Sequence, residues 1–409
     1  MKLSDIVLKN LKQSIGTDDL LLPMYFESPI DVGKPVATLE QQGSIIRDFL
    51  LIVSRIARKA LIDDEDEELI HLLFSEAPMG LTTEYHKALP SCCWNIPIIF
   101  RTDESVSGKI YEIQAPGSGW GDLYLLSKSY KELGIDVPAD LLSFPENYTC
   151  NIMKATNTTV PKVFHLTDAA SVPSSIRYLI SITDKIKYWG YSSDVSMHDI
   201  DCIISHSVVS TVATNFFVDY LQMAKEGKLL FGISPNLIFD EKAIYLLPFH
   251  RKTMHYFSDS VRKLFPYTSL IENNGFYNSD GSFVTIDRFV NLPPRDRKYY
   301  LKYGGPDTNR NWGSRSVYRL SGNDCESLLK SAAIKASKGE VWLIQEDESK
   351  TIEPGSLSHD LQDLIFNKKL HIKLSSFYGL SNQPMGRKVM GRHHFKVHGQ
   401  KDTFIGLGI

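Results

Sequence analysis

The chain has 409 residues, a formal net charge of −3 and 43% hydrophobic residues, which is typical of a globular protein of two or three domains. The small net charge excludes a global field that would attract nucleic acid or a membrane surface. No run of about 18 apolar residues predicts a membrane span, and five cysteines without metal or disulfide spacing favour a reduced, cytoplasmic setting.

The first region, residues 1–134, begins with a mainly helical part up to about residue 90. Leu3, Ile6, Val7 and Leu11 form a helical stripe rather than a signal peptide. Residues 45–56 carry a second stripe with the same spacing. The acidic run 63–68 then predicts a solvated helix start, since acids favour helix N-termini; attraction of a substrate cation is the alternative.

The end of this region carries a candidate metal site. Residues 95–100 (NIPIIF) predict a short strand that delivers Arg101 and Asp103. Residues 109–114 alternate, so Glu112 and Gln114 share one strand face, and Ser107-Gly108 predicts a hairpin turn between the strands. The hairpin brings Asp103 opposite Glu112 and Gln114, a set of oxygens that suits Mg²⁺. A solvated hairpin edge is the alternative.

The second region, residues 135–235, alternates strands and helices. Strands are predicted at 160–166, 201–209 and 228–233, and helices at 174–187 and 211–225, after a helix at 123–133. This alternation indicates a small parallel α/β domain. Gly117, Gly119 and Gly121 do not have the spacing of a dinucleotide fingerprint.

The third region, residues 236–409, carries candidate phosphate ligands. Lys242 begins a predicted helix within 239–249. Lys302 ends a predicted strand at 298–302 and precedes a glycine-rich loop without the Walker order. Backbone amides of such a loop approach phosphate oxygens closely, and arginine adds forked donors. The candidate phosphate-binding residues of the loop are Gly304, Gly305, Arg310, Gly313, Ser314 and Arg315.

The remaining elements of this region are shorter. Strands are predicted at 317–320, 341–345 and 370–374, with a helix at 327–337. The strand 341–345 ends in Gln345-Glu346. The tail, residues 387–402, is basic, rich in glycine and short of apolar pattern, which predicts either a loop that closes over a substrate anion or a disordered segment. Its histidines do not have zinc spacing.

Taken in order, these motifs resemble the permuted ATP-grasp ligases represented by the synthetase domain of glutathionylspermidine synthetase. An R-x-D element (Arg101-Thr102-Asp103) and an E-x-N-like element (Glu112-Ile113-Gln114) come early, and nucleotide lysines come late. The resemblance implies a mixed α/β (α+β) fold that holds ATP between two α+β lobes, with the small parallel domain beside them. It covers roughly residues 95–350.

The resemblance also implies roles. Asp103, Glu112 and Gln114 would hold Mg²⁺, and Arg101, Lys302 and Arg315 would act on the transferring phosphoryl group. Lys242, Lys302, Gly304, Gly305, Gly313 and Ser314 would bind ATP phosphates, and Gln345 and Glu346 would meet adenosine. Gln114 replaces the usual asparagine, Tyr303 replaces a proline, and Lys373 or Arg387 would replace a substrate-end arginine.

The implied activity is ATP- and Mg²⁺-dependent ligation of a small-molecule carboxylate, such as an amino acid or peptide, to an amine through an acyl phosphate. Nucleic acid and membrane are not expected as partners. Two alternatives remain open: a small-molecule kinase on the same scaffold, and a non-catalytic scaffold that binds a nucleotide. The absence of a G-x-S-x-G element agrees with chemistry that needs no serine nucleophile.

Overall fold

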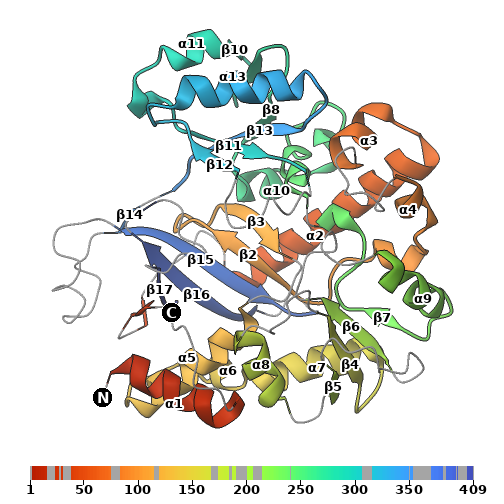
Figure 1. The fold of residues 1–409 in the computed structure, drawn as a ribbon, viewed down its shortest axis with the longest axis vertical. Coiled ribbons are helices and arrows are strands. Elements are labelled where there is room, and N and C mark those ends of the chain that lie inside the picture. Colours follow the sequence, from red (N-terminus) through yellow and green to blue (C-terminus); the bar gives the residue numbers. More distant parts are fainter. Residues whose placement is uncertain are drawn as a thin grey trace.

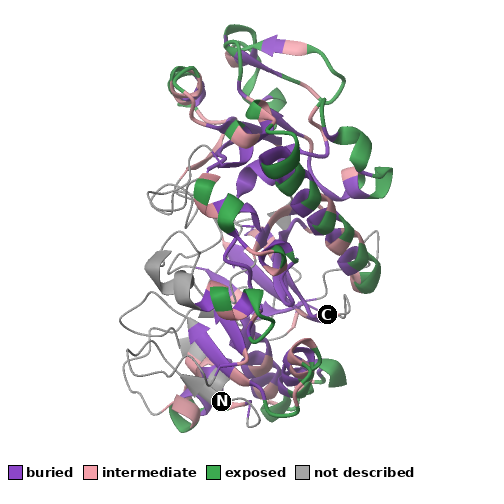
Figure 2. Ribbon diagram, turned by 90° about the vertical axis from the view of Figure 1, so that its right-hand side faces the viewer, coloured by how far each residue is buried: buried purple, intermediate pink, exposed green. Residues whose placement is uncertain are grey.

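A computed structural model gives a mixed α/β protein with several sheets, which confirms the general fold class (Figure 1). It describes residues 2–15, 24–26, 29–30, 38–74, 83–114, 119–166, 174–183, 187–189, 200–205, 214–239, 241–305, 316–349, 351–352, 370–380, 384–392, 394 and 403–408. Figure 2 shows buried residues concentrated in the strands. Among the described helices, none has the length and apolarity needed to cross a membrane.

The largest sheet joins strands from both ends of the sequence. Its order is β1-β17-β16-β15-β2-β3, with β14 also paired to β15. All neighbours are antiparallel except β1 and β17. The strands are β1 (Met24–Tyr25), β2 (Phe100–Glu104), β3 (Ile110–Gln114), β14 (Thr351–Ile352), β15 (Leu370–Tyr378), β16 (Pro384–Arg392) and β17 (Phe404–Leu407). The early hairpin is therefore completed by strands that follow it by more than two hundred residues.

Two predictions for segments of this sheet are corrected. The strand expected at 95–100 begins only at Phe100, so Arg101 and Asp103 lie within β2 rather than after it. The tail, residues 387–402, was expected to be a loop or disordered, but its first part, 387–392, belongs to the strand β16, and another strand, β17, follows at 404–407; residues 393 and 395–402 lie outside the described residues. Apolar alternation is missing because Gly391 and Gly406 lie against the ring of Phe26, where an added Cβ would approach it to 2.9 and 3.0 Å.

Helices cover both faces of this sheet. Phe377 packs edge-on against Trp120 of α5 (Trp120–Glu132), whereas the hydroxyl of the next residue, Tyr378, donates to Gln42 of α2 (Leu39–Arg58). Because neighbouring residues of a strand point to opposite faces, α5 and α2 lie on opposite sides. Trp120 is therefore buried in the core. The helices beside α5 are α1 (Leu3–Ile15), α6 (Ala139–Leu142), α7 (Phe144–Thr156) and α8 (Ser174–Ser181).

Helix α2 continues into shorter helical segments. Thr38 and Gln41 form a capping box at its start. A π-helical turn (Lys59–Asp63) follows α2, then α3 (Glu67–Phe74) and α4 (Thr83–Ala88). The acidic run begins α3 as predicted, because the Asp66 carboxylate accepts from the amides of Glu68 and Leu69.

The second region contains the predicted parallel sheet, with strand order β5-β4-β6-β7. Its strands are β4 (Lys162–Leu166), β5 (Lys187–Trp189), β6 (Cys202–Ser205) and β7 (Leu230–Phe231), and α9 (Thr214–Lys225) joins β6 to β7. The helix expected at 174–187 was too long: α8 ends at Ser181, and Lys187 belongs to β5.

A four-stranded antiparallel sheet, ordered β12-β11-β13-β8, forms the upper part of Figure 1. Its strands are β8 (Thr268–Leu270), β11 (Tyr299–Tyr303), β12 (Val317–Arg319) and β13 (Trp342–Glu346). The hairpin β9 (Gly275–Tyr277) and β10 (Phe283–Thr285), with α10 (Asp259–Leu264), α11 (Ile286–Val290) and α13 (Cys325–Ala336), completes this lobe. The helix expected from Lys242 is a 3₁₀ turn, Lys242–Leu246.

Candidate active site

The β2–β3 hairpin forms one wall of the candidate site. Gly108 has a φ of 84°, which suits glycine, and its amide donates to the Ser105 carbonyl in the turn. The register places Asp103 directly opposite Glu112, as the sequence predicted, whereas Gln114 lies opposite Arg101. Two carboxylates opposite each other repel, so this pair requires cations nearby.

Asp103 is buried and surrounded by donors. Its carboxylate accepts from Lys373 Nζ at 2.6 Å and from Ser375 Oγ at 2.8 Å, and it lies 3.3 Å from Arg101 Nε. Arg101 also donates to the Gln114 side-chain oxygen. Burial lowers the pKa of Lys373, and the charge of Asp103 opposes this change. Lys373, considered from the sequence as a substitute for the substrate-end arginine, therefore lies within the proposed metal site.

Glu112 is the more accessible carboxylate. Its side chain is 35% exposed, and its Oε1 lies 3.9 Å from Nζ of Lys242, whose side chain is 8% exposed. The backbone amide of Lys242 donates to the carbonyl of Gly304, which fixes the 3₁₀ turn against the end of β11. Lys242 thus extends from the four-stranded lobe toward the hairpin.

Lys302 approaches the same hairpin from β11. Its ammonium donates to the Gln345 side-chain oxygen and lies 5.4 Å from the centre of the Tyr111 ring. The pKa of Lys302 is lowered to about 8, mainly because the side chain is buried; the charge of Lys242 also lowers it, and the charge of Glu112 opposes the change. The proximity of the early carboxylates and the late lysine, predicted from the sequence, is therefore confirmed.

Cationic side chains gather in this cluster. Four cationic side chains, Arg101, Lys242, Lys302 and Lys373, surround the two carboxylates of the hairpin. All four are largely buried, where each charge needs a counter-charge close by. An anion with several negative charges, such as a polyphosphate, would balance them.

Of the glycines after Lys302, Gly304 and Gly305 are among the described residues and Gly313 is not. Gly304 is buried against Val341: its amide donates to the Val341 carbonyl, and an added Cβ would lie 2.6 Å from Val341 Cγ1. The expectation that this amide binds phosphate is wrong, because the amide is already bonded. Gly305 is buried beside it. Arg310, Trp312, Gly313, Ser314 and Arg315 lie outside the described residues.

The end of β13 differs from the expected adenosine contact. Gln345 lies on the Lys302 face, but Glu346 follows it on the opposite face, where it accepts from Ser279 Oγ at 3.0 Å. The amide of Glu346 donates to the Tyr267 carbonyl. Asp347, which the sequence analysis did not select, returns to the site face. It accepts from Arg319 Nε at 2.7 Å, and its charge raises the pKa of Lys302.

The described part of the basic tail, up to Arg392, contributes buried ion pairs. Arg387 lies 3.2 Å from the Glu104 carboxylate, and Lys388 lies 2.8 Å from Asp122 at the start of α5. Arg387, the other proposed substitute for the substrate-end arginine, is thus occupied within the sheet. His393, Lys396 and His398 lie outside the described residues.

No protein-family model matches the chain, and no curated protein matches it.

The oxygen atoms of the hairpin are the candidate ligands for Mg²⁺. Among the described residues, no group of three or more His, Cys, Asp and Glu side chains could hold a metal ion. Asp103, Glu112 and Gln114 offer two carboxylates and one amide oxygen on adjacent strands, which are the ligand types that Mg²⁺ prefers, but the Gln114 oxygen accepts from Arg101 in this structure. Since Lys373 and Ser375 occupy Asp103, Glu112 offers the most accessible oxygen.

Proposed function

We propose that this protein is an ATP- and Mg²⁺-dependent ligase that joins a small-molecule carboxylate to an amine through an acyl phosphate, releasing ADP and phosphate. The observation that supports this most is the convergence of the hairpin carboxylates with Lys242 and Lys302 in one buried cluster. Such a cluster suits a triphosphate whose charge is shared with Mg²⁺.

The reaction consists of two displacements. An oxygen of the substrate carboxylate attacks the γ-phosphorus of ATP, the bond between the γ-phosphorus and the β,γ-bridging oxygen breaks, and ADP leaves. The amine nitrogen then attacks the carbonyl carbon, the bond from that carbon to the phosphate oxygen breaks, and the nitrogen loses a proton. Positioning and charge stabilisation lower both barriers, so the protein needs no nucleophile of its own.

The residues of the cluster have distinct tasks in this proposal. Lys242 and Lys302 hold the phosphates, and Arg101 stabilises negative charge on the transferring group. Glu112, Asp103 and Gln114 would hold Mg²⁺, which supplies Lewis-acid stabilisation of phosphate charge when bound. A reaction that uses ATP also fits the cytoplasmic setting expected from the chain's cysteines, all of which are free thiols.

The test has two stages. A non-hydrolysable ATP analogue with Mg²⁺ is titrated calorimetrically into the wild type, Lys302→Met and the control Lys298→Met; only the first substitution should weaken binding, by roughly tenfold or more. ADP release is then measured with panels of acids and amines. Amine-dependent release of ADP and phosphate supports the proposal, whereas AMP and pyrophosphate contradict it. A stable phosphorylated product without an amine indicates a kinase, and binding without turnover indicates a non-catalytic scaffold.

A further inference from the structure

The ammonium of Lys302 is bonded to a glutamine whose own side chain is bonded from its other end. Gln345 of β13 is 1% exposed, and Thr268 of β8 lies directly opposite it in the antiparallel pair. The Gln345 side-chain oxygen accepts from Lys302 Nζ, and its side-chain nitrogen donates to Thr268 Oγ1 at 3.1 Å. Thr268, Gln345 and Lys302 therefore form a chain of hydrogen bonds across β8, β13 and β11 of the four-stranded lobe.

The hydroxyl of Thr268 gives this chain a direction. A threonine hydroxyl has a single proton, and here that proton is donated to the carbonyl of Pro266 at 3.1 Å. Toward Gln345 the hydroxyl oxygen can therefore only accept, so the amide nitrogen points to Thr268 and the amide oxygen to Lys302. The reversed amide would place its NH₂ group against the ammonium and its oxygen against a hydroxyl with no proton to give.

Burial makes this orientation important. Thr268 is 1% exposed and Lys302 is 7% exposed, and a buried polar group that loses its partner costs more free energy than a hydrogen bond contributes. Charges from two other elements also act on the ammonium, since Glu112 favours its charged form and Lys242 opposes it. These charges act from different sides, whereas the bond to Gln345 fixes where the ammonium lies.

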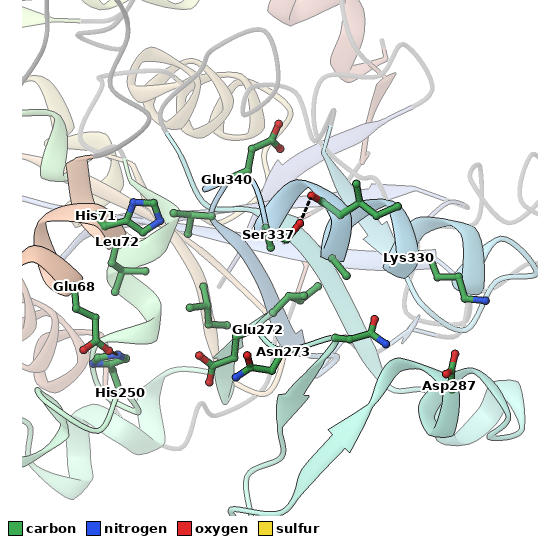
Figure 3. A pocket seen from close by; sticks show the side chains of 17 residues that line it. Glu68, His71, Leu72, His250, Glu272, Asn273, Asp287, Lys330, Ser337 and Glu340 are labelled. Carbon is green, nitrogen blue, oxygen red and sulfur yellow. Dashed lines mark hydrogen bonds and ion pairs between the residues drawn. The ribbon is translucent and has the colours of Figure 1, made fainter.

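A groove near β8 does not account for the Thr268 hydroxyl. Leu270, at the other end of β8, lines this groove, and Figure 3 shows Glu272 and Asn273 on the turn that follows. Thr268 and Gln345 do not belong to the lining of the groove. The hydroxyl therefore serves the chain of hydrogen bonds that ends at Lys302.

We propose that Thr268 is a positioning residue of the candidate active site. Its hydroxyl fixes the Gln345 amide with the oxygen toward Lys302, and this holds the ammonium where it would meet a phosphate. The contact with phosphate rests on the proposed function, whereas the orientation of the amide does not. Thr268 acts only through Gln345.

The orientation is tested by NMR without nucleotide. In protein isotopically labelled at its glutamine side chains, the amide signals of Gln345 are assigned by their loss in Gln345→Met, and their hydrogen exchange is measured. Exchange should be slow in the wild type and in Thr268→Ser, which keeps the hydroxyl. It should be about fivefold faster or more in Thr268→Val, which has the same shape but no acceptor. Equal exchange in Thr268→Val and the wild type would overturn the proposal.

The effect on binding is tested by calorimetric titration with a non-hydrolysable ATP analogue and Mg²⁺. Thr268→Val should weaken binding about fivefold, the effect of one lost hydrogen bond between neutral groups, and Thr268→Ser should bind as the wild type does. In a Gln345→Met background, Thr268→Val should have no further effect, because no amide remains to be oriented. An equal loss of affinity in both backgrounds would contradict a role through Gln345.

Ser269→Ala is the matched control. Ser269 is the next residue of β8 and so faces the other side of the sheet, where its Oγ accepts from the Tyr277 amide at 3.2 Å. The substitution removes a buried hydroxyl and should lower the unfolding midpoint, but it should leave the Gln345 exchange and the nucleotide affinity unchanged. An equal loss of affinity in Ser269→Ala and Thr268→Val would mean that a general loosening of β8 is the cause, and would overturn the proposal. If the wild type does not bind the analogue, the proposed function fails, while the exchange rates still decide whether Thr268 orients Gln345.

Discussion

Replacing Lys302 with methionine should make the protein more stable while it weakens nucleotide binding. Burial lowers the pKa of Lys302 from 10.5 to about 8, a change that corresponds to about 3 kcal/mol against the charged form in the folded state. Methionine has similar length and no charge. It also removes the donor to Gln345, which costs about 1–2 kcal/mol. The net gain in unfolding free energy at neutral pH is therefore about 1–2 kcal/mol.

The pH dependence of this gain follows from linkage. Below about pH 8 the lysine is protonated in both states, so the folded wild type bears the full cost of its buried charge. Between about pH 8 and 10.5 the folded state releases the proton while the unfolded state keeps it, so the wild type gains stability as pH rises. The advantage of Lys302→Met should therefore shrink across this window. Urea denaturation at several pH values measures it.

The control is Lys298→Met, which changes an exposed lysine just before β11. It should alter stability by less than about 0.5 kcal/mol at every pH. A Lys302→Met variant that is less stable than the wild type at neutral pH, by a difference that does not change up to about pH 10.5, would show that the buried charge of Lys302 does not destabilise the fold. The same preparations should show that affinity for the ATP analogue falls while stability rises, as expected for a charge retained for binding.

Three further substitutions test other parts of the structure. Glu112→Gln should remove Mg²⁺-dependent binding of the ATP analogue, measured calorimetrically, and change the unfolding free energy by less than about 1 kcal/mol, because its ion pair is long and partly exposed. Arg387→Met should cost about 3–5 kcal/mol in urea denaturation, because it leaves the buried Glu104 carboxylate without its cation. Gly304→Ala should cost about 1–3 kcal/mol in thermal unfolding, because its Cβ would overlap Val341.

Each of these expectations has a contrary outcome. Unchanged Mg²⁺ dependence in Glu112→Gln would show that this carboxylate does not hold the metal. Arg387→Lys keeps the charge and should lose less stability than Arg387→Met; equal losses would mean that the ion pair is not the cause. Wild-type stability in Gly304→Ala would mean that Val341 can move aside.

The local features of the candidate site were predictable from the sequence. Alternation in residues 109–114 and the Ser107-Gly108 turn were enough to place Asp103 opposite Glu112. A strand ending in Lys302 was equally clear from its apolar residues. These features depend on short-range geometry, in which each residue's face follows from its neighbours.

Other features depend on long-range packing and were missed. The tail strands lack alternation because their glycines contact Phe26, which follows β1 and is more than 350 residues earlier in the sequence. Lys373 could not be assigned to Asp103, because the pairing of β15 with β2 spans about 270 residues and has no local signal. Asp347 was overlooked because it follows the last residue of β13. The face toward which such a residue points depends on where the strand ends, and the sequence does not fix that position.

The joining of β2 to β15 affects how this protein forms during synthesis. A ribosome releases the acidic hairpin early, but the strands that neutralise and cover it, β15 to β17, emerge only near residue 407. Until then Asp103 has no lysine partner from β15, and the edge of β2 has no neighbour from the later strands. Domains generally fold as units, and exposed strand edges promote aggregation. The nascent chain is therefore most vulnerable while this sheet is still incomplete.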